Sequence, residues 1–284
     1  MKSILPLTIA LGSAALLTAQ VATKSAKKKQ AVVPVAEVKW GALNPARGDK
    51  GPRAANLWGD RTGTGACGFL VKFVDGFSSP PHIHNVTYRG VVISGLLHND
   101  DPDAEPMWMP PSSFWTQPAG EVHITASKGE SLAYIEIEKG PYLVLSKDEA
   151  FDKGERPVNV DASNIVWQDS SNTSWIANSA TGAEIAFLWG KPQGDQLSGT
   201  LVKLPANFSG KLRSGGANLH AIVIKGQPLH KSPTKADAKP MQPGSYFGSD
   251  GEAEHEIASG KEGECLIYIR SSGDFEILGA DPVK

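Results

Sequence analysis

The chain repeats its own sequence, and this repeat constrains the fold more than any other feature. The tripeptide Leu-Trp-Gly at 57–59 recurs at 188–190, an offset of 131 residues. The same offset carries 68–72 onto 199–203, and matches further along the chain drift only to an offset of 134. Because chance does not keep one register over so long a stretch, we interpret the pattern as a duplication that produces two domains of ordinary size.

The apolar segments within each copy are short and rich in β-forming residues. Hairpin-like turns of Gly, Pro, Asp and Asn bound them, and helical periodicity is missing apart from a weak stretch near 146–152. The 30 glycines and 20 prolines favour a turn-rich β protein. We therefore expect an all-β sandwich or barrel, with strands at 69–74, 90–97, 131–137, 221–225 and 265–269.

The start of the chain has the features of an export signal. Lys2 supplies a positive charge, 4–17 form an apolar run, and Leu-Thr-Ala at 17–19 offers a cleavage site of small residues. The run is short for a membrane span, which needs about 20 apolar residues. We predict a signal peptide at 1–19, a basic linker at 20–31, domains at 32–155 and 156–284, and a periplasmic or secreted location without membrane attachment after cleavage.

Charge and cysteine content exclude some classes of partner. The 28 basic and 30 acidic residues nearly balance, so the chain offers no electrostatic footprint for nucleic acid. Cys67 and Cys265 occupy different places in the repeat, and we expect two separate buried thiols. We expect a small-molecule ligand or substrate as partner, and homodimerisation is compatible with the sequence.

Two motifs of the first copy hold histidines. The first, 76–95, runs from Gly through His82, His84 and Tyr88 to a second Gly, and the second, 118–123, reads PAGEVH. In this order and at this separation they resemble the two motifs of the cupin superfamily, although Tyr88 stands where cupins have Glu. The resemblance covers most of 57–138 and implies two tandem cupin barrels, that is, double-stranded β-helix or jelly-roll domains.

The spacing of the histidines favours a metal site. On a strand, His82 and His84 point to the same face, and His123 follows a turn and comes from another strand. Three imidazoles converging in a barrel mouth would bind one divalent metal, zinc or iron(II), and leave positions open. The alternative is that all three are ordinary polar residues at a rim or in the core.

The missing glutamate bears on the chemistry. Three neutral histidines leave the charge of the metal uncompensated, which favours an anionic or enolisable ligand. We expect Tyr88 to donate a hydrogen bond to a bound water or ligand. Glu121 is a candidate fourth ligand or general base, or else a solvated loop carboxylate.

The second copy lacks most of these residues. At the repeat offset His82 corresponds to Arg213, and only His123 keeps a counterpart, His255. His220 and His230 lie near enough in sequence to rebuild a partial site if the register slips by one. We expect the second domain to be structural, with its site degenerate.

The resemblance implies two classes of function. The chain is similar to bacterial bicupins whose barrels resemble the cupin domain of ChrR-type anti-sigma factors. Its three-histidine set also resembles that of acetylacetone-cleaving dioxygenase, which uses iron(II) to open a β-diketone with oxygen. We expect a metal-dependent enzyme, an oxygenase or hydrolytic enzyme, acting on a small polar or enolisable compound. The alternative is a non-catalytic module or sensor that binds metal or a small ligand.

Overall fold

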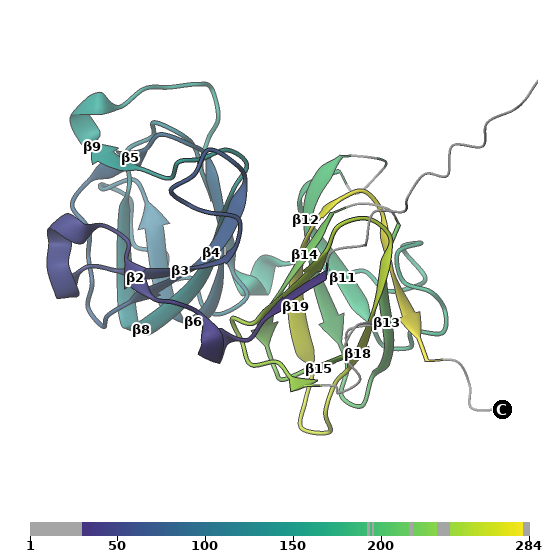
Figure 1. Ribbon diagram of the computed structural model, residues 1–284. Helices are drawn as coiled ribbons and strands as arrows, with labels where there is room; N and C mark the ends of the chain where they lie inside the picture. The colour runs from purple at the N-terminus through teal and green to yellow at the C-terminus, as the bar shows by residue number, and fades with distance from the viewer. Residues whose placement is uncertain (1–29, 192–193, 195, 216–217, 232–238, 281–284) are drawn as a thin grey trace, which may run out of the picture.

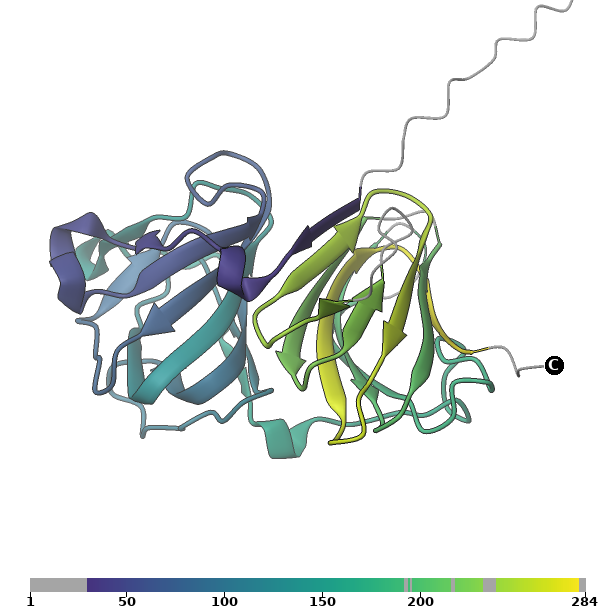
Figure 2. The same ribbon diagram turned by 60° about the horizontal axis from the view of Figure 1, so that its bottom comes forward.

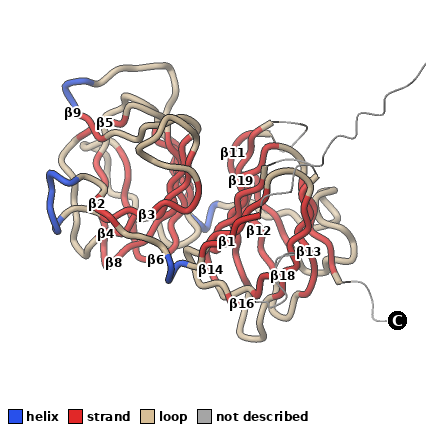
Figure 3. The backbone as a smooth tube through the Cα atoms, viewed as in Figure 1, coloured by secondary structure: helices blue, strands red, loops and turns tan. Residues whose placement is uncertain are grey.

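The computed structural model describes residues 30–191, 194, 196–215, 218–231 and 239–280. The predicted signal peptide and residues 20–29 of the predicted linker lie outside these described residues. Within them the chain forms twenty strands and four short 3-10 helices (Figure 3), which confirms the all-β class. None of the described helices has the length and apolar character needed to span a membrane.

The first barrel is built from a seven-stranded antiparallel sheet and a two-stranded one, at the left of Figure 1. The larger sheet has the order β10-β7-β6-β8-β4-β3-β2, and β5 pairs with β9 in the smaller one. The strands are β2 (Gly41–Ala42), β3 (Arg53–Trp58), β4 (Cys67–Phe73), β5 (His82–His84), β6 (Tyr88–Asp100), β7 (Phe114–Gln117), β8 (Ile124–Ile137), β9 (Val144–Ser146) and β10 (Val158–Val160). The 3-10 helices η1 (Val35–Glu37), η2 (Pro45–Lys50), η3 (Lys147–Glu149) and η4 (Ala162–Asn164) lie in the connections.

The second barrel is built from a six-stranded and a five-stranded antiparallel sheet. Their orders are β1-β17-β14-β19-β12-β11 and β16-β15-β18-β13-β20. The strands are β1 (Gln30–Val33), β11 (Glu184–Gly190), β12 (Leu197–Leu204), β13 (Ser209–Ser214), β14 (Leu219–Lys225), β15 (Leu229–Lys231), β16 (Lys239–Pro240), β17 (Tyr246–Ser249), β18 (Ala253–Ala258), β19 (Cys265–Ser272) and β20 (Phe275–Gly279). The five strands expected from the sequence all form, and the weak helical stretch near 146 is only η3.

The repeat in the sequence is a repeat in the structure. The long bent strand β6 corresponds to β14 followed by β15, and β8 corresponds to β18 followed by β19. Gly95, at the bend of β6, has φ 77°, and its counterpart Gly226 has φ 78°. A side chain at either position would be strained in this conformation, which accounts for a glycine at both. Each barrel encloses its own apolar core.

Two strands pair with the sheet of the other repeat. β1 runs antiparallel to β17 of the second barrel, and it is the purple strand that lies against that barrel in Figure 2. β10 pairs with β7 of the first barrel, with Asn159 opposite Trp115. Strand pairing therefore crosses the boundary predicted at 155–156 in both directions.

The two barrels share a buried, nearly symmetric interface. Trp58 Nε1 donates a hydrogen bond to the Tyr134 hydroxyl over 3.0 Å, and Trp189 Nε1 donates to the Tyr268 hydroxyl over 2.8 Å. Glu136 lies between the two halves and accepts from Tyr134 at 3.1 Å and from Tyr268 at 2.9 Å. Because the paired residues occupy equivalent positions of the repeat, the barrels meet about an approximate two-fold axis.

Cys67 and Cys265 are separate, buried free thiols, as expected. Cys67 lies in β4 of the first barrel and Cys265 in β19 of the second. Burial raises the pKa of the Cys67 thiol to about 12. Both side chains therefore act as small apolar core residues.

Candidate metal centre

The three histidines meet where two segments of the first barrel pair. His82 and His84 are the ends of the short strand β5, so both side chains face the barrel interior, with ring centroids 5.1 Å apart. His123 directly precedes β8 and forms an antiparallel bridge with His82. The His82 and His123 ring centroids lie 4.3 Å apart. The predicted convergence of these residues from two strands is observed.

Backbone carbonyls orient all three imidazole rings. The Nδ1 atoms lie 3.0 Å from the Pro80 oxygen in His82, 2.9 Å from the Leu143 oxygen in His84, and 3.1 Å from the Glu121 oxygen in His123. A carbonyl only accepts, so each Nδ1 carries the proton of a neutral ring and each Nε2 keeps a lone pair. Such carbonyl partners are the usual support of metal-binding histidines.

The histidine group fits a divalent metal. One ring nitrogen from each side chain lies within 4.8 Å of the others, and all three residues are buried. Burial lowers the pKa of each ring, to about 3 for His123, and neighbouring histidines lower the His84 pKa further. The rings are therefore neutral near pH 7, which is the state that binds a metal.

Tyr88 lies against this group, as expected from its place in the motif. Its hydroxyl donates to Asn99 Oδ1 over 2.9 Å and lies 3.3 Å from His123 Nε2. A phenol has one proton, and the shorter bond to Asn99 takes it, so the Nε2 lone pair of His123 remains available. Burial raises the Tyr88 pKa, which keeps the phenol neutral.

Tyr142 is a site residue that the sequence analysis missed. Its ring stacks on His84 with centroids 4.4 Å apart, and its hydroxyl lies 3.2 Å from His84 Nε2. It comes from the connection between β8 and β9. No motif or periodicity marks this position, so only the folded chain reveals it.

Glu121 contributes its backbone rather than its side chain to the histidine group. Its carbonyl oxygen accepts from His123 Nδ1 and from Gln117 Nε2, the latter over 3.3 Å. Its carboxylate does not join the three histidines in the metal-binding group found among the described residues. Burial raises the pKa of this carboxyl group.

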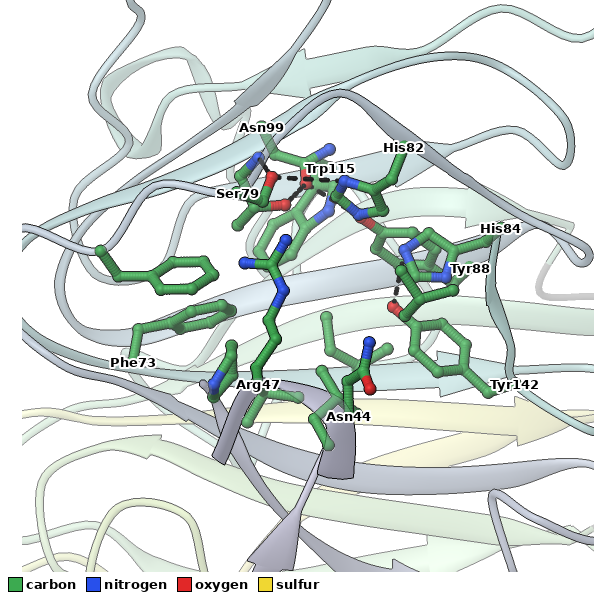
Figure 4. A pocket seen from close by; sticks show the side chains of 17 residues that line it. Asn44, Arg47, Phe73, Ser79, His82, His84, Tyr88, Asn99, Trp115 and Tyr142 are labelled. Atoms are coloured by element: carbon green, nitrogen blue, oxygen red, sulfur yellow. Dashed lines mark hydrogen bonds between the residues drawn. The ribbon is translucent and has the colours of Figure 1, made fainter. Parts of the chain in front are cut away.

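A pocket opens onto His82, His84 and Tyr88 (Figure 4). Its cavity volume is about 60 Å³, and it continues into an open mouth. Most of its walls are apolar or aromatic, including Phe73 and Trp115. His123 is fully buried and supports the histidine group without lining the pocket.

The second barrel replaces the first two histidines with other residues. Leu212 lies opposite His255 as His82 lies opposite His123, so Leu212, and not Arg213 as the sequence offset suggested, takes the place of His82. Arg213 is exposed and forms an ion pair with Glu276. His255 Nδ1 lies 3.1 Å from His230 Nε2, and His255 Nε2 lies 3.1 Å from the Ser249 hydroxyl. His220 does not reach this group, because it stacks on Trp58 in the interface between the barrels with centroids 3.9 Å apart. Two histidines, not three, thus come together here among the described residues.

Two jelly-roll barrels in one chain, with histidines converging inside one of them, define a cupin-type protein. The chain belongs to the family described as domain of unknown function DUF4437, whose model matches residues 31–278. No curated protein matches the sequence.

Solved structures support the fold. A candidate dioxygenase from Nostoc punctiforme superposes with a TM-score of 0.66 at 14% identity, over 93% of this chain and 90% of that one. YlbA from E. coli gives 0.56 at 13% identity, over 85% and 90% of the two chains. Vicilin from hazelnut, Corylus avellana, gives 0.54 at 10% identity, over 87% of each. At these identities the likeness establishes the architecture and leaves the reaction to the site residues.

Proposed function

We propose that the chain binds one divalent metal at His82, His84 and His123 and uses it on a small molecule held in the pocket of the first barrel. The observation that carries this proposal is the orientation of the three rings, each fixed by a backbone carbonyl at Nδ1. Rings fixed in this way present their Nε2 lone pairs to a common point. Zinc and iron(II) both suit imidazole ligands.

The proposed activity is that of a metal-dependent enzyme, an oxygenase or a hydrolytic enzyme. A metal bound by neutral ligands would act as a Lewis acid on an oxygen atom of the ligand, which suits a polar or enolisable compound. The chain supplies a partly enclosed pocket whose largely apolar walls limit the water at the histidines. Tyr88 and Asn99 supply hydroxyl and amide groups that orient a ligand at the histidines.

A non-catalytic role in binding metal or a small ligand is the second candidate. It is favoured by the absence of any carboxylate among the described residues that line the pocket. The histidines, if they hold a metal, and the high-pKa tyrosines leave no group poised for proton transfer near pH 7.

Turnover distinguishes the two candidates. Protein reconstituted with iron(II) is tested for oxygen uptake with a panel of β-diketones, and zinc-loaded protein is tested for hydrolysis of small esters and lactones. Turnover that His84→Ala abolishes supports the enzyme. Saturable ligand binding without turnover under either metal supports the binding module.

We also propose that the protein is exported. The proposal rests on the positive start, the apolar run at 4–17 and the small residues at 17–19. A periplasmic or secreted location follows from it.

A further inference from the structure

The pocket of the first barrel contains one charged side chain besides its histidines, and that side chain is Arg47. No carboxylate is among the described residues that line it. The pocket is therefore positively charged before any metal is added.

The guanidinium of Arg47 has no anionic partner among the residues whose side chains the structure describes. Its one aromatic contact is with Phe77, whose ring centroid lies 5.9 Å from Cζ. Figure 4 shows the side chain extending into the pocket between Phe73 on one side and His82 and His84 on the other. A half-buried guanidinium that lines a pocket is a ready binding group for a carboxylate.

The local backbone fixes the position of this arginine. Arg47 lies in η2 and its backbone N–H donates to the Asn44 oxygen over 3.1 Å. Gly51 packs so closely that a Cβ at that position would lie 2.8 Å from Arg47 Cβ. These contacts hold the backbone of Arg47 beside the pocket, which its half-buried side chain lines.

The remaining walls indicate the body of the ligand. Phe73, Phe77 and Trp115 provide aromatic surface, and Val71 and Ile135 provide aliphatic surface. The buried Trp115 indole N–H lies near the Tyr88 hydroxyl but forms no hydrogen bond of regular geometry to the described residues. A flat apolar body with oxygen atoms at its ends would match these walls and donors.

We propose that Arg47 is the specificity-determining residue of this pocket and binds the carboxylate of a small acid with an apolar, preferably aromatic, body. The inference names the ligand class of the site in the proposed function, and in that sense rests on it. The carboxylate lies at the guanidinium, and the apolar body extends along the aromatic wall toward the histidines.

The test compares an acid with its neutral isostere. Binding of 3-phenylpropionate and 3-phenylpropionamide is measured by calorimetry, on chelator-treated protein and again with zinc added. The variants are Arg47→Met, which removes the charge, Arg47→Lys, which keeps it, and Arg156→Met. Arg156 is a matched control because it is exposed and pairs with Asp152 away from the pocket.

We expect the unaltered protein to prefer the acid at least about tenfold over the amide. Arg47→Met should weaken binding of the acid by about 10- to 100-fold, as expected for lost hydrogen bonds to a charged group. Binding of the amide should be unchanged. Arg47→Lys should bind the acid with an affinity between those of the unaltered protein and Arg47→Met, because the lysine ammonium is a point charge and lacks the forked donors of a guanidinium. Arg156→Met should bind like the unaltered protein.

Three outcomes overturn the proposal: no binding of the acid, equal binding of acid and amide, or an equal loss of both in Arg47→Met with its fold intact by circular dichroism. The preference should persist in chelator-treated protein. A persisting preference in a protein that binds no metal would refute the proposed function alone. Bound metal with no preference would refute this inference alone.

Discussion

His82 and His123 lie directly opposite one another and exchange both backbone hydrogen bonds, His82 N to the His123 oxygen over 3.1 Å and His123 N to the His82 oxygen over 3.0 Å. Opposed residues of an antiparallel bridge present their side chains on the same face. The bridge therefore sets the separation of the two rings before any metal binds. His84 joins them because it is two residues along the same strand.

Tyr88→Phe tests whether the phenol acts at the histidine group. The variant keeps the ring and loses the hydroxyl that lies 3.3 Å from His123 Nε2. The hydroxyl gives its proton to Asn99 and not to His123 Nε2, so its oxygen is free to support a bound metal or a metal-bound water. Its loss should therefore lower zinc affinity by about 10-fold to 100-fold. Competition with a chelating indicator measures the affinity, and an unchanged value would mean that Tyr88 only fills space.

Tyr142→Phe should not lower zinc affinity, and it serves as the comparison for Tyr88→Phe. The Tyr142 hydroxyl lies 3.2 Å from His84 Nε2, where it competes with a metal for the same lone pair. Removing it should leave zinc affinity equal or higher. A loss as large as that in Tyr88→Phe would show that both phenols support the metal in the same way.

Tyr88→Glu restores the residue that cupins have at this position. A carboxylate lowers the net charge at the three histidines. We therefore expect this variant to bind zinc more tightly and anionic ligands more weakly. Indicator competition and calorimetry measure the two affinities. No change in either would contradict the placement of residue 88 beside the metal.

Local patterns predicted the all-β class and the convergence of the three histidines, and the resemblance to cupins supplied the two barrels. Strand signals, the repeat and the alternation along 82–84 are all readable from short windows of the chain. Tyr142 and Arg47 were not predicted as site residues, because each reaches the pocket from an irregular connection whose path depends on tertiary packing. The pairing of β1 with β17 and of β10 with β7 was not predicted either, because pairing between distant short strands has no local signature in the sequence.

Arg270→Met tests the interface between the barrels. Arg270 Nε lies 3.8 Å from Glu136 Oε1, and both side chains are buried. Burial raises the pKa of Glu136, and Arg270 is the main group that opposes this shift. Removing one member of a buried pair should cost about 3 kcal/mol of unfolding free energy.

Addition of Glu136→Gln should recover much of that loss, because the uncompensated charge disappears and one of the two tyrosine hydroxyls keeps an oxygen acceptor. Guanidinium denaturation of the single and double variants measures both effects. If the double variant is as unstable as Arg270→Met, the charge of Glu136 does not account for the loss.

The buried histidines of the second barrel should make stability depend on pH. Burial lowers the pKa of His255 to about 4 and, together with His255, that of His230 to about 3. An unfolded histidine titrates near about 6.5, so the unfolded state binds more protons as pH falls. The contribution of each histidine to the free energy of unfolding is fully present above pH of about 6.5. It is lost as the pH falls toward the pKa of that histidine in the folded state.

For His255 the loss between pH 7 and pH 5 should be about 2 kcal/mol. Denaturation of chelator-treated protein at both values should show it, and His255→Gln should have a shallower pH dependence. If the stability of the variant depends on pH as strongly as that of the unaltered protein, the His255 pKa does not differ between the folded and unfolded states.

Export predicts a shortened chain. Cleavage after Ala19 should give a mature protein that begins near Gln20. Mass spectrometry of protein recovered from its native host measures the mass and N-terminal peptide. An intact Met1 would contradict the predicted cleavage.

Metal content per chain tests the central claim most directly. Protein purified without chelator, loaded with zinc or iron(II) and freed of excess metal is analysed by plasma mass spectrometry together with His82→Ala, His123→Ala and His255→Ala. We predict one metal per chain in the unaltered protein, none in His82→Ala or His123→Ala, and one in His255→Ala. Two metals per chain, or metal that survives both substitutions in the first barrel, would contradict a single centre at His82, His84 and His123.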